Sequence, residues 1–144
     1  MSEDSRQEWV QIPTYRTCFV CGEQNPIGLK LKFFSLPDGT VETEYIPKPE
    51  HCGYSGIVHG GIISAILDEG IGWTGFVPFG KYYLTMELRV RFRKPVRLGR
   101  KYKFRGELVK KVGNVYVARG ALMDEEGTVY AEGEGKYFLT DEPE

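Results

Sequence analysis

The chain has 144 residues, a formal net charge of -1 at pH 7 and three cysteines, so it can form one hydrophobic core but is too poor in cysteine for a disulfide scaffold. The near-neutral charge argues against a protein built as a whole to bind nucleic acid. No apolar run approaches the roughly 18 residues that a membrane-spanning helix needs, and no signal-like segment is present, which predicts a cytoplasmic protein without a membrane span.

The first third of the chain predicts an arm followed by a hairpin. Residues 1–16 are polar and mixed in charge, so we expect a flexible N-terminal arm before a single domain at 17–140. Residues 29–33 alternate apolar and basic side chains, as a half-buried strand does. The turn residues 37–39, Pro-Asp-Gly, then lead to a second strand at 41–45.

The rest of the chain predicts one helix and four strands. Residues 60–73 form the one long helical segment, which is rich in isoleucine and small residues. A strand is expected next at 84–93, where apolar residues alternate with Thr85 and charged side chains. Three further strands are expected near 101–111, 114–124 and 128–139, separated by turns that contain glycine.

These elements predict an α+β fold. An antiparallel sheet with one buried face needs a cover, and the single apolar helix is the candidate. We therefore expect a curved antiparallel sheet of about six strands wrapped around one long central helix. A second face of this helix carries a stripe of small residues interrupted by one acid: Gly61, Ser64 or Ala65, Asp68, Gly72 and Gly75. The stripe fits close packing against the chain's own strands or against a symmetric partner, and both remain open.

The most distinctive motif places His59, Gly60 and Gly61 directly before the helix, with Asp68 further along it. The first N–H groups of a helix have no intrahelical partner, and glycine lets a ligand oxygen approach them closely. Asp68 lies a little over two helical turns after Gly60, so its carboxylate and the Gly60 N–H cannot serve the same ligand atom. We therefore expect one chain to carry only half of a site.

The pattern G-x-V-H-G-G, six residues and then Asp resembles the active-site helix of hotdog-fold acyl-CoA thioesterases of the 4-hydroxybenzoyl-CoA and phenylacetyl-CoA type. The resemblance extends to the segments 18–29 and 91–96 and covers most of residues 18–139. It implies the hotdog fold and hydrolysis of an acyl-CoA or aryl-CoA thioester, with no cofactor and no metal. It also implies a homodimer or homotetramer whose sheets join edge to edge and whose active sites take residues from both subunits.

The resemblance assigns roles to four catalytic residues. The thioester carbonyl oxygen accepts a hydrogen bond from the Gly60 N–H, with Gly61 as a second donor. Asp68 of the other subunit attacks as a nucleophile or as a general base on water, and the sequence does not choose between the two. His59 holds the loop and orients the thioester, and Thr85 forms a hydrogen bond near the acid or its water.

Further residues are expected at the substrate: Gly61, Ser64, Glu69, Arg91 and Arg93. Glu69 is turned by about 100° from Asp68, so it cannot address the same point, and we expect it to face a strand edge or solvent. Arg91 and Arg93 belong to a basic cluster at 89–111, which suits the phosphates of CoA or forms the solvated outer face of a sheet. Aromatic side chains in this cluster are expected to point inward, which argues against nucleic acid.

The sequence departs from the resemblance just before the motif. Many of these enzymes have an Asn or Gln six or seven residues before the histidine, where this chain has Gly53 and Cys52. His51 and Ser55 are the candidates to replace that amide. The alternative is a non-catalytic acyl-CoA-binding protein, a sensor or carrier. A hydratase or dehydratase of related fold is weaker because the usual His-Phe-Pro motif is absent.

Cys18 and Cys21 have the spacing of half a zinc site. Only Cys52 and the histidines at 51 and 59 are at hand in the sequence to complete it. We therefore expect two half-buried thiols packed with Phe19 and no metal.

Overall fold

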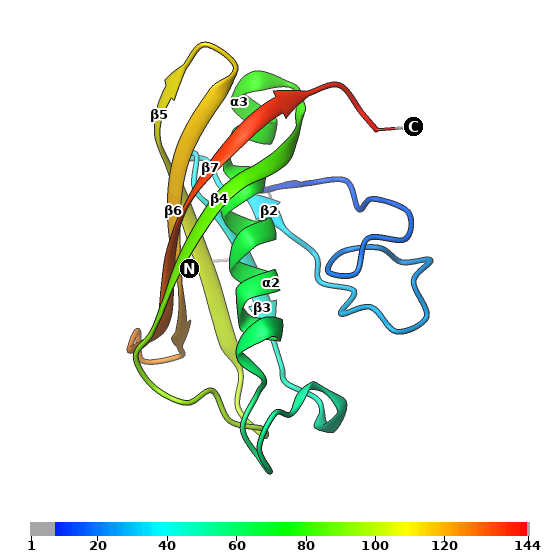
Figure 1. The fold of residues 1–144 in the computed structure, drawn as a ribbon, viewed down its shortest axis with the longest axis vertical. Helices are drawn as coiled ribbons and strands as arrows, with labels where there is room; N and C mark the ends of the chain where they lie inside the picture. The colour runs from blue at the N-terminus through cyan, green and yellow to red at the C-terminus, as the bar shows by residue number, and fades with distance from the viewer. Residues whose placement is uncertain (1–7, 144) are drawn as a thin grey trace.

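One long helix lies in the hollow of a curved antiparallel sheet (Figure 1). The computed structural model describes residues 8–143. The seven strands follow the order β1-β2-β3-β5-β6-β7-β4 across the sheet, and every neighbouring pair is antiparallel. The expected α+β fold is confirmed, with seven strands in place of about six. In chain order the elements are β1 (Val10–Gln11), β2 (Phe34–Ser35), β3 (Val41–Tyr45), the 3-10 turn η1 (Pro49–His51), α2 (Gly60–Gly72), the 3-10 turn η2 (Trp73–Gly75), α3 (Phe76–Phe79), β4 (Tyr82–Phe92), β5 (Tyr102–Val112), β6 (Val115–Asp124) and β7 (Val129–Thr140).

The additional strand comes from the segment expected to be a flexible arm. In β1, Val10 pairs with Ser35 of β2, and the following Ile12 is only 2% exposed. Residues 1–7 of the expected arm lie outside the described residues. The division into an arm at 1–16 and a domain at 17–140 stays a prediction.

The strand expected at 29–33 is wrong, because the chain becomes a strand only at Phe34. Lys30 has a φ of 53°, in the left-handed region, and such a residue cannot continue an extended strand. The alternation still identified the buried side chains, since Leu29, Leu31 and Phe33 all belong to the core.

Glycines bring α2 and the residues after it close to the strands. An added Cβ at Gly72 would overlap the Tyr83 ring of β4, and one at Gly75 would overlap the Tyr116 ring of β6. At these two positions the stripe of small residues packs against the chain's own strands and not against a partner subunit.

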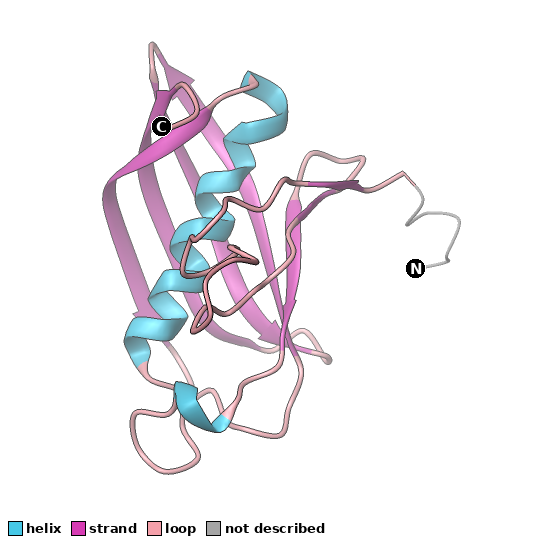
Figure 2. Cartoon of the chain, turned by 90° about the vertical axis from the view of Figure 1, so that its right-hand side faces the viewer, coloured by secondary structure: helices cyan, strands magenta, loops and turns pink. Residues whose placement is uncertain are grey.

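The segment from Ile12 to Phe33 crosses α2 on the side away from the sheet (Figures 1 and 2). Val20 and Cys21 of this segment join the hydrophobic core. The middle of α2 is therefore enclosed between the sheet and this segment, whereas its first turn stays at the surface, with His59 and Gly61 exposed. Within residues 8–143, no helix is long and apolar enough to cross a membrane.

Candidate active site

The first turn of α2 offers one free backbone donor. His59 is the N-cap, and its Nδ1 accepts the Gly61 N–H at 2.8 Å. The carbonyl oxygen of His59 accepts the N–H groups of Ile62 and Ile63, at 3.0 and 3.3 Å. In the described part of the chain the Gly60 N–H therefore has no partner. The expectation that Gly61 is a second donor to the substrate is wrong in this structure, because its N–H is taken by His59.

The free N–H of Gly60 borders a cavity of about 640 Å³, which we call the helix-start cavity. An added Cβ at Gly60 would lie 3.4 Å from the ring of Phe92, an ordinary contact, so the glycine lies beside the aromatic wall of this cavity. Arg93 and Lys94 give the cavity a positive rim. Arg93 is also held by Glu132, with Nη2 and Oε1 2.5 Å apart.

Asp68 is half-buried further along α2 and is held by two hydroxyl groups. Thr85 Oγ1 lies 2.9 Å from Oδ1 and 3.2 Å from Oδ2, and Tyr137 Oη lies 3.2 Å from Oδ1. Tyr137 also donates to the carbonyl oxygen of Asp68 at 3.1 Å. Burial raises the pKa of the Asp68 carboxyl above its ordinary value, while the bonds from Thr85 and Tyr137 act in the opposite direction.

A bulge in β4 brings Thr85 to Asp68. The register between β4 and β7 shifts between Thr85 and Glu87, so the strict alternation expected for this strand is interrupted. Thr85 consequently faces α2 on the side where Leu88 and Val90 pack against the core. The sequence also missed Tyr137, because nothing in the local pattern of β7 signals a bond to an acid 69 residues earlier.

Gly60 and Asp68 lie far apart on one helix. Eight residues at about 1.5 Å rise each place them roughly 12 Å apart along α2. A thioester carbonyl at Gly60 is thus out of reach of Asp68 from the same chain. That one chain carries half of a site stays a prediction.

Two residues expected at the substrate are engaged elsewhere. Ser64 is half-buried and its hydroxyl donates to the carbonyl oxygen of Gly60 at 2.9 Å, one turn back along the helix. Glu69 is only 7% exposed and accepts from Cys18 Sγ at 2.8 Å, on the side covered by the N-terminal segment. The expectation that Glu69 faces solvent or a strand edge is wrong. Burial raises its pKa to about 8, and the nearby Cys18 adds to the rise.

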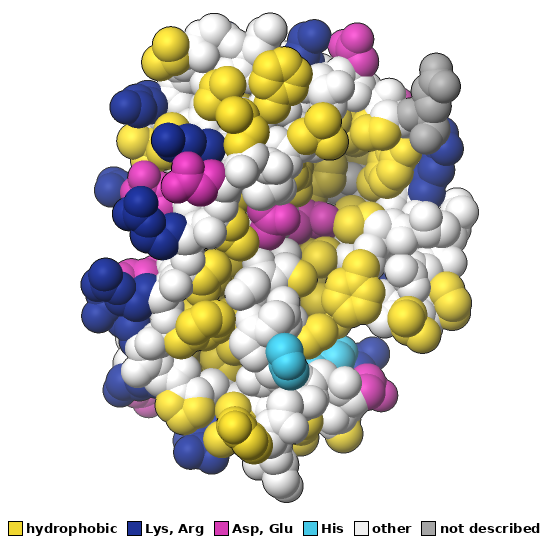
Figure 3. Space-filling view, viewed as in Figure 1, with side chains coloured by type: hydrophobic (Ala, Val, Ile, Leu, Met, Phe, Trp, Pro, Cys, Tyr) yellow, Lys and Arg dark blue, Asp and Glu magenta, His cyan; other side chains and the backbone are white. Residues whose placement is uncertain are grey.

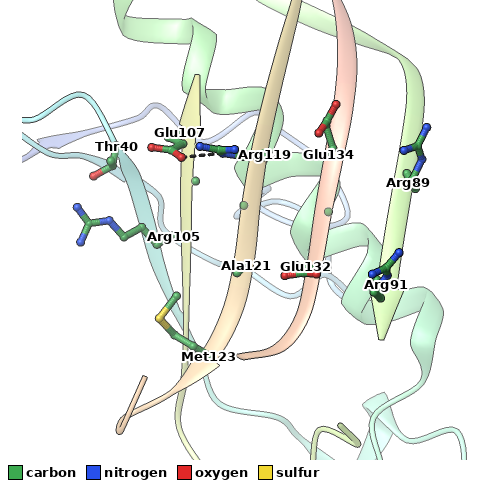
Figure 4. A pocket seen from close by; sticks show the side chains of 13 residues that line it. Thr40, Arg89, Arg91, Arg105, Glu107, Arg119, Ala121, Met123, Glu132 and Glu134 are labelled. Atoms are coloured by element: carbon green, nitrogen blue, oxygen red, sulfur yellow. Dashed lines mark hydrogen bonds and ion pairs between the residues drawn. The ribbon is translucent and has the colours of Figure 1, made fainter. Parts of the chain in front are cut away.

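Arg91 lies on the face of the sheet that points away from α2. It lines a groove of about 520 Å³ together with charged side chains of four strands (Figure 4). Several of these charges are paired across strands, such as Arg119 with Glu107 at 2.7 Å. The basic cluster is thus divided, because Arg93 lies at the helix-start cavity whereas Arg91 belongs to the solvated outer face.

Basic side chains gather along the border where the sheet lies, and the middle of the face that shows α2 is hydrophobic with a patch of acidic side chains (Figure 3).

The segment before the motif supplies no amide to the cavity. Gly53 borders the helix-start cavity, and Cys52 pairs with Val58 in an isolated β-bridge. His51, one candidate to replace the amide, is 8% exposed, and its Nδ1 is engaged with Tyr45 Oη at 2.8 Å. His51 therefore anchors the loop rather than facing the substrate.

Comparisons with known proteins identify one family and several structures of similar fold. Residues 55–131 match the model of a family described as the thioesterase superfamily. A crystal structure of a thioesterase superfamily protein is 27% identical with a TM-score of 0.77, over 85% of this chain and 63% of that one. The chain thus spans less than two thirds of that relative. The search of curated proteins found no match.

Two further similar structures contain CoA. A Bacillus halodurans protein solved with CoA is 24% identical, with a TM-score of 0.69 over 80% of this chain and 77% of that one. A hypothetical thioesterase from Streptococcus pneumoniae solved with coenzyme A is 20% identical, with a TM-score of 0.67 over 74% and 86%. At these identities the likeness shows the fold, which is the fold that the sequence predicts.

Proposed function

The chain belongs to the thioesterase superfamily, and from this premise we propose that it hydrolyses an acyl-CoA or aryl-CoA thioester to the free acid and CoA. The observation that carries the proposal is the presence of two groups on α2. This helix has one unpartnered N–H, at Gly60, and one half-buried acid, Asp68, held by Thr85 and Tyr137. The CoA present in two similar structures supports the substrate class.

In the proposed reaction the thioester carbonyl oxygen accepts the Gly60 N–H at the positive end of α2. Negative charge grows on that oxygen in the transition state, and one such donor is worth roughly 3–4 kcal/mol. His59 does not contact the oxygen, but it fixes the turn by accepting the Gly61 N–H. Gly61 and Ser64 support the helix start, and Arg93 with Lys94 offers positive charge to the phosphates of CoA at the cavity rim.

Asp68 of the partner subunit supplies the attack, as a nucleophile on the carbonyl carbon or as a general base on water. In both routes Thr85 and Tyr137 hold the carboxylate in one orientation. The water oxygen ends in the free acid, and the departing thiolate of CoA takes up a proton.

The partner is proposed to join at β4. This strand lies at one end of the sheet, and its described residues pair on one side only, with β7. Leu84 and Met86 are 57% and 59% exposed on either side of Thr85, so an apolar edge flanks the residue that holds Asp68. A homodimer paired through β4 covers this edge and brings α2 of each subunit toward the other, and a homotetramer remains open. The cytoplasmic location stays a prediction.

An acyl-CoA sensor or carrier is the second candidate. It is favoured by the missing amide, because neither Gly53 nor Cys52 can position a water and His51 is turned away. The experiment that decides is release of free CoA from a panel of aryl- and fatty-acyl-CoAs by the wild type and by Asp68→Asn, with binding measured by calorimetry. Turnover that collapses in Asp68→Asn while binding persists supports the thioesterase. Binding without turnover of any thioester by the wild type contradicts it.

A further inference from the structure

Three potential metal ligands meet where the segment from Ile12 to Phe33 crosses α2. The sulfur atoms of Cys18 and Cys21 and a carboxylate oxygen of Glu69 all lie within 4.8 Å of one another. Within residues 8–143, this is the one group of three or more Cys, His, Asp or Glu side chains placed closely enough to hold a single ion. None of the three takes part in the proposed hydrolysis.

The backbone brings the two cysteines together in a tight turn. The Gly22 N–H donates to the Cys18 carbonyl at 2.8 Å, and Gly22 is packed so closely that a Cβ would collide with the backbone of Cys18. The Tyr15 N–H points to Cys21 Sγ at 3.3 Å. This N–H favours the thiolate, which is the form that binds metal, whereas the hydrogen bond with Cys18 and burial raise the pKa of the metal-free Cys21 thiol.

Glu69 has a carboxylate oxygen that is open to a ligand. Its side chain is 7% exposed, and while Oε1 is bonded to Cys18, Oε2 has no hydrogen-bond partner. The buried indole N–H of Trp73 lies beside the carboxyl and lowers its pKa. A bare buried carboxylate oxygen is costly, so Oε2 has room to gain by binding a ligand.

We propose that Cys18, Cys21 and Glu69 bind one Zn²⁺ ion. Two thiolates and a carboxylate are ligands that zinc takes, at about 2.3 and 2.1 Å, and Cys18 is exposed enough for a water molecule to fill the fourth position. Each thiol gives its proton to solvent on binding, and so does the Glu69 carboxyl, which its raised pKa of about 8 keeps largely protonated near neutral pH. The contact between Cys18 Sγ and Glu69 Oε1 opens from 2.8 Å to about 3.6 Å in a tetrahedral site.

The ion would fasten the N-terminal segment to α2. Cys18 and Cys21 belong to the segment that crosses the helix opposite the sheet, and Glu69 belongs to the helix (Figure 2). Metal binding therefore stabilises the fold rather than the reaction. The sequence alone does not place Glu69 beside the two cysteines, because Glu69 lies 51 residues from Cys18.

The test is titration of the reduced, metal-free full chain with Co²⁺ and then Zn²⁺. We expect one equivalent of Co²⁺ per chain, a thiolate-to-cobalt charge-transfer band that Zn²⁺ abolishes, and a rise in Tm with Zn²⁺. Zn²⁺ should also protect two of the three thiols from a thiol reagent. Cys18→Ser and Cys21→Ser should lose the band, and Glu69→Gln should bind at least tenfold more weakly. Cys52→Ser is the matched control and should behave as the wild type.

Several outcomes would overturn the proposal. They are a reduced wild type that gives no charge-transfer band, three thiols that stay reactive in Zn²⁺, or loss of binding in Cys52→Ser. Unchanged affinity in Glu69→Gln would remove Glu69 from the site. If Cys18→Ser fails to fold, thiol protection in the wild type still decides, and no outcome depends on hydrolytic activity.

Discussion

Thr85 Oγ1 lies within hydrogen-bond distance of both carboxylate oxygens of Asp68, at 2.9 and 3.2 Å, because the bulge in β4 turns its side chain toward α2. Thr85 does not contact substrate in the proposed mechanism. It is a positioning residue, and its contribution should appear in kcat.

Replacement of Thr85 by valine keeps the shape of the side chain but removes the hydroxyl. A hydrogen bond to a charged group is worth about 1.5–3 kcal/mol, so we expect kcat to fall about 10- to 100-fold with little change in KM. Thr85→Ser keeps the hydroxyl and should retain most of the activity. Steady-state kinetics on the best acyl-CoA substrate decide, and equal losses in both variants would argue against a role for the hydroxyl.

Tyr137→Phe tests the second bond to Asp68. The ring stays in place against Gly135, and only the hydroxyl that donates to Oδ1 and to the Asp68 carbonyl is lost. We expect kcat to drop about tenfold or more and the free energy of unfolding to drop by about 1 kcal/mol. Tyr116→Phe is the matched control, because that hydroxyl donates to the Gly72 carbonyl instead. It should lose stability but keep activity; a loss of kcat as large as that of Tyr137→Phe would contradict the assignment.

Gly70 should be far less tolerant of a methyl group than Gly60, although both lie on α2. A Cβ at Gly70 would overlap the Phe104 ring in the closed core, whereas one at Gly60 would meet the Phe92 ring at an ordinary 3.4 Å. Overpacking of a core typically costs 1–3 kcal/mol, so we expect Gly70→Ala to lower the free energy of unfolding by about that amount. The urea midpoint of Gly60→Ala should be close to that of the wild type. Equal midpoints for Gly60→Ala and Gly70→Ala would argue against close packing of Gly70 on Phe104.

The sequence predicted the features that depend on neighbouring residues and missed those that depend on contacts between distant segments. Periodicity identified α2 and the long strands because it records which face is buried. It failed at Lys30 and at the bulge after Thr85, where one backbone conformation changes the register. It could not find Tyr137 beside Asp68 or Cys18 beside Glu69, because those contacts depend on how distant segments pack.

His51 should make a contribution to stability that is lost below neutral pH. Its Nδ1 accepts from Lys48 N–H at 3.2 Å and is engaged with Tyr45 Oη, and burial lowers its pKa below the ordinary value of 6.5. The unfolded chain therefore binds a proton more readily than the folded chain. This contribution is fully present above pH 6.5 and is lost as pH falls from 6.5 through the lowered pKa of the folded state.

In urea unfolding followed between pH 7.5 and about 5, the wild type should lose stability relative to His51→Gln as pH falls. Glu69, whose raised pKa acts in the opposite direction, is present in both chains and cancels in this difference. The matched control is His59→Gln, the other of the chain's two histidines. If His59→Gln flattened the profile and His51→Gln did not, the assignment to His51 would be wrong.

Charge on the β4 edge should separate the proposed subunits. Leu84 and Met86 are exposed there, and Met86→Glu would bury a carboxylate against its symmetric copy in a dimer. We expect a shift to monomer in sedimentation experiments, with loss of turnover and retained secondary structure by circular dichroism. Val112→Glu is the matched control, since Val112 is 73% exposed at the end of β5. A monomeric Met86→Glu with full turnover would contradict a shared active site.

Complementation between two inactive chains tests the shared site directly. Gly60→Pro removes the free N–H at a position where helices accept proline, and His59 already has the extended conformation, with a ψ of 135°, that the residue before a proline needs. Asp68→Asn removes the attacking group. Each variant alone should be inactive, because both of its sites lack one half. In a co-refolded equal mixture half of the dimers are mixed, and each mixed dimer has one intact site built from Gly60 of one chain and Asp68 of the other. Such a mixture should therefore recover about a quarter of the wild-type kcat per chain. No recovery, with mixed dimers shown by differently tagged chains, would place both residues in the same subunit's site, against the distance of roughly 12 Å along α2.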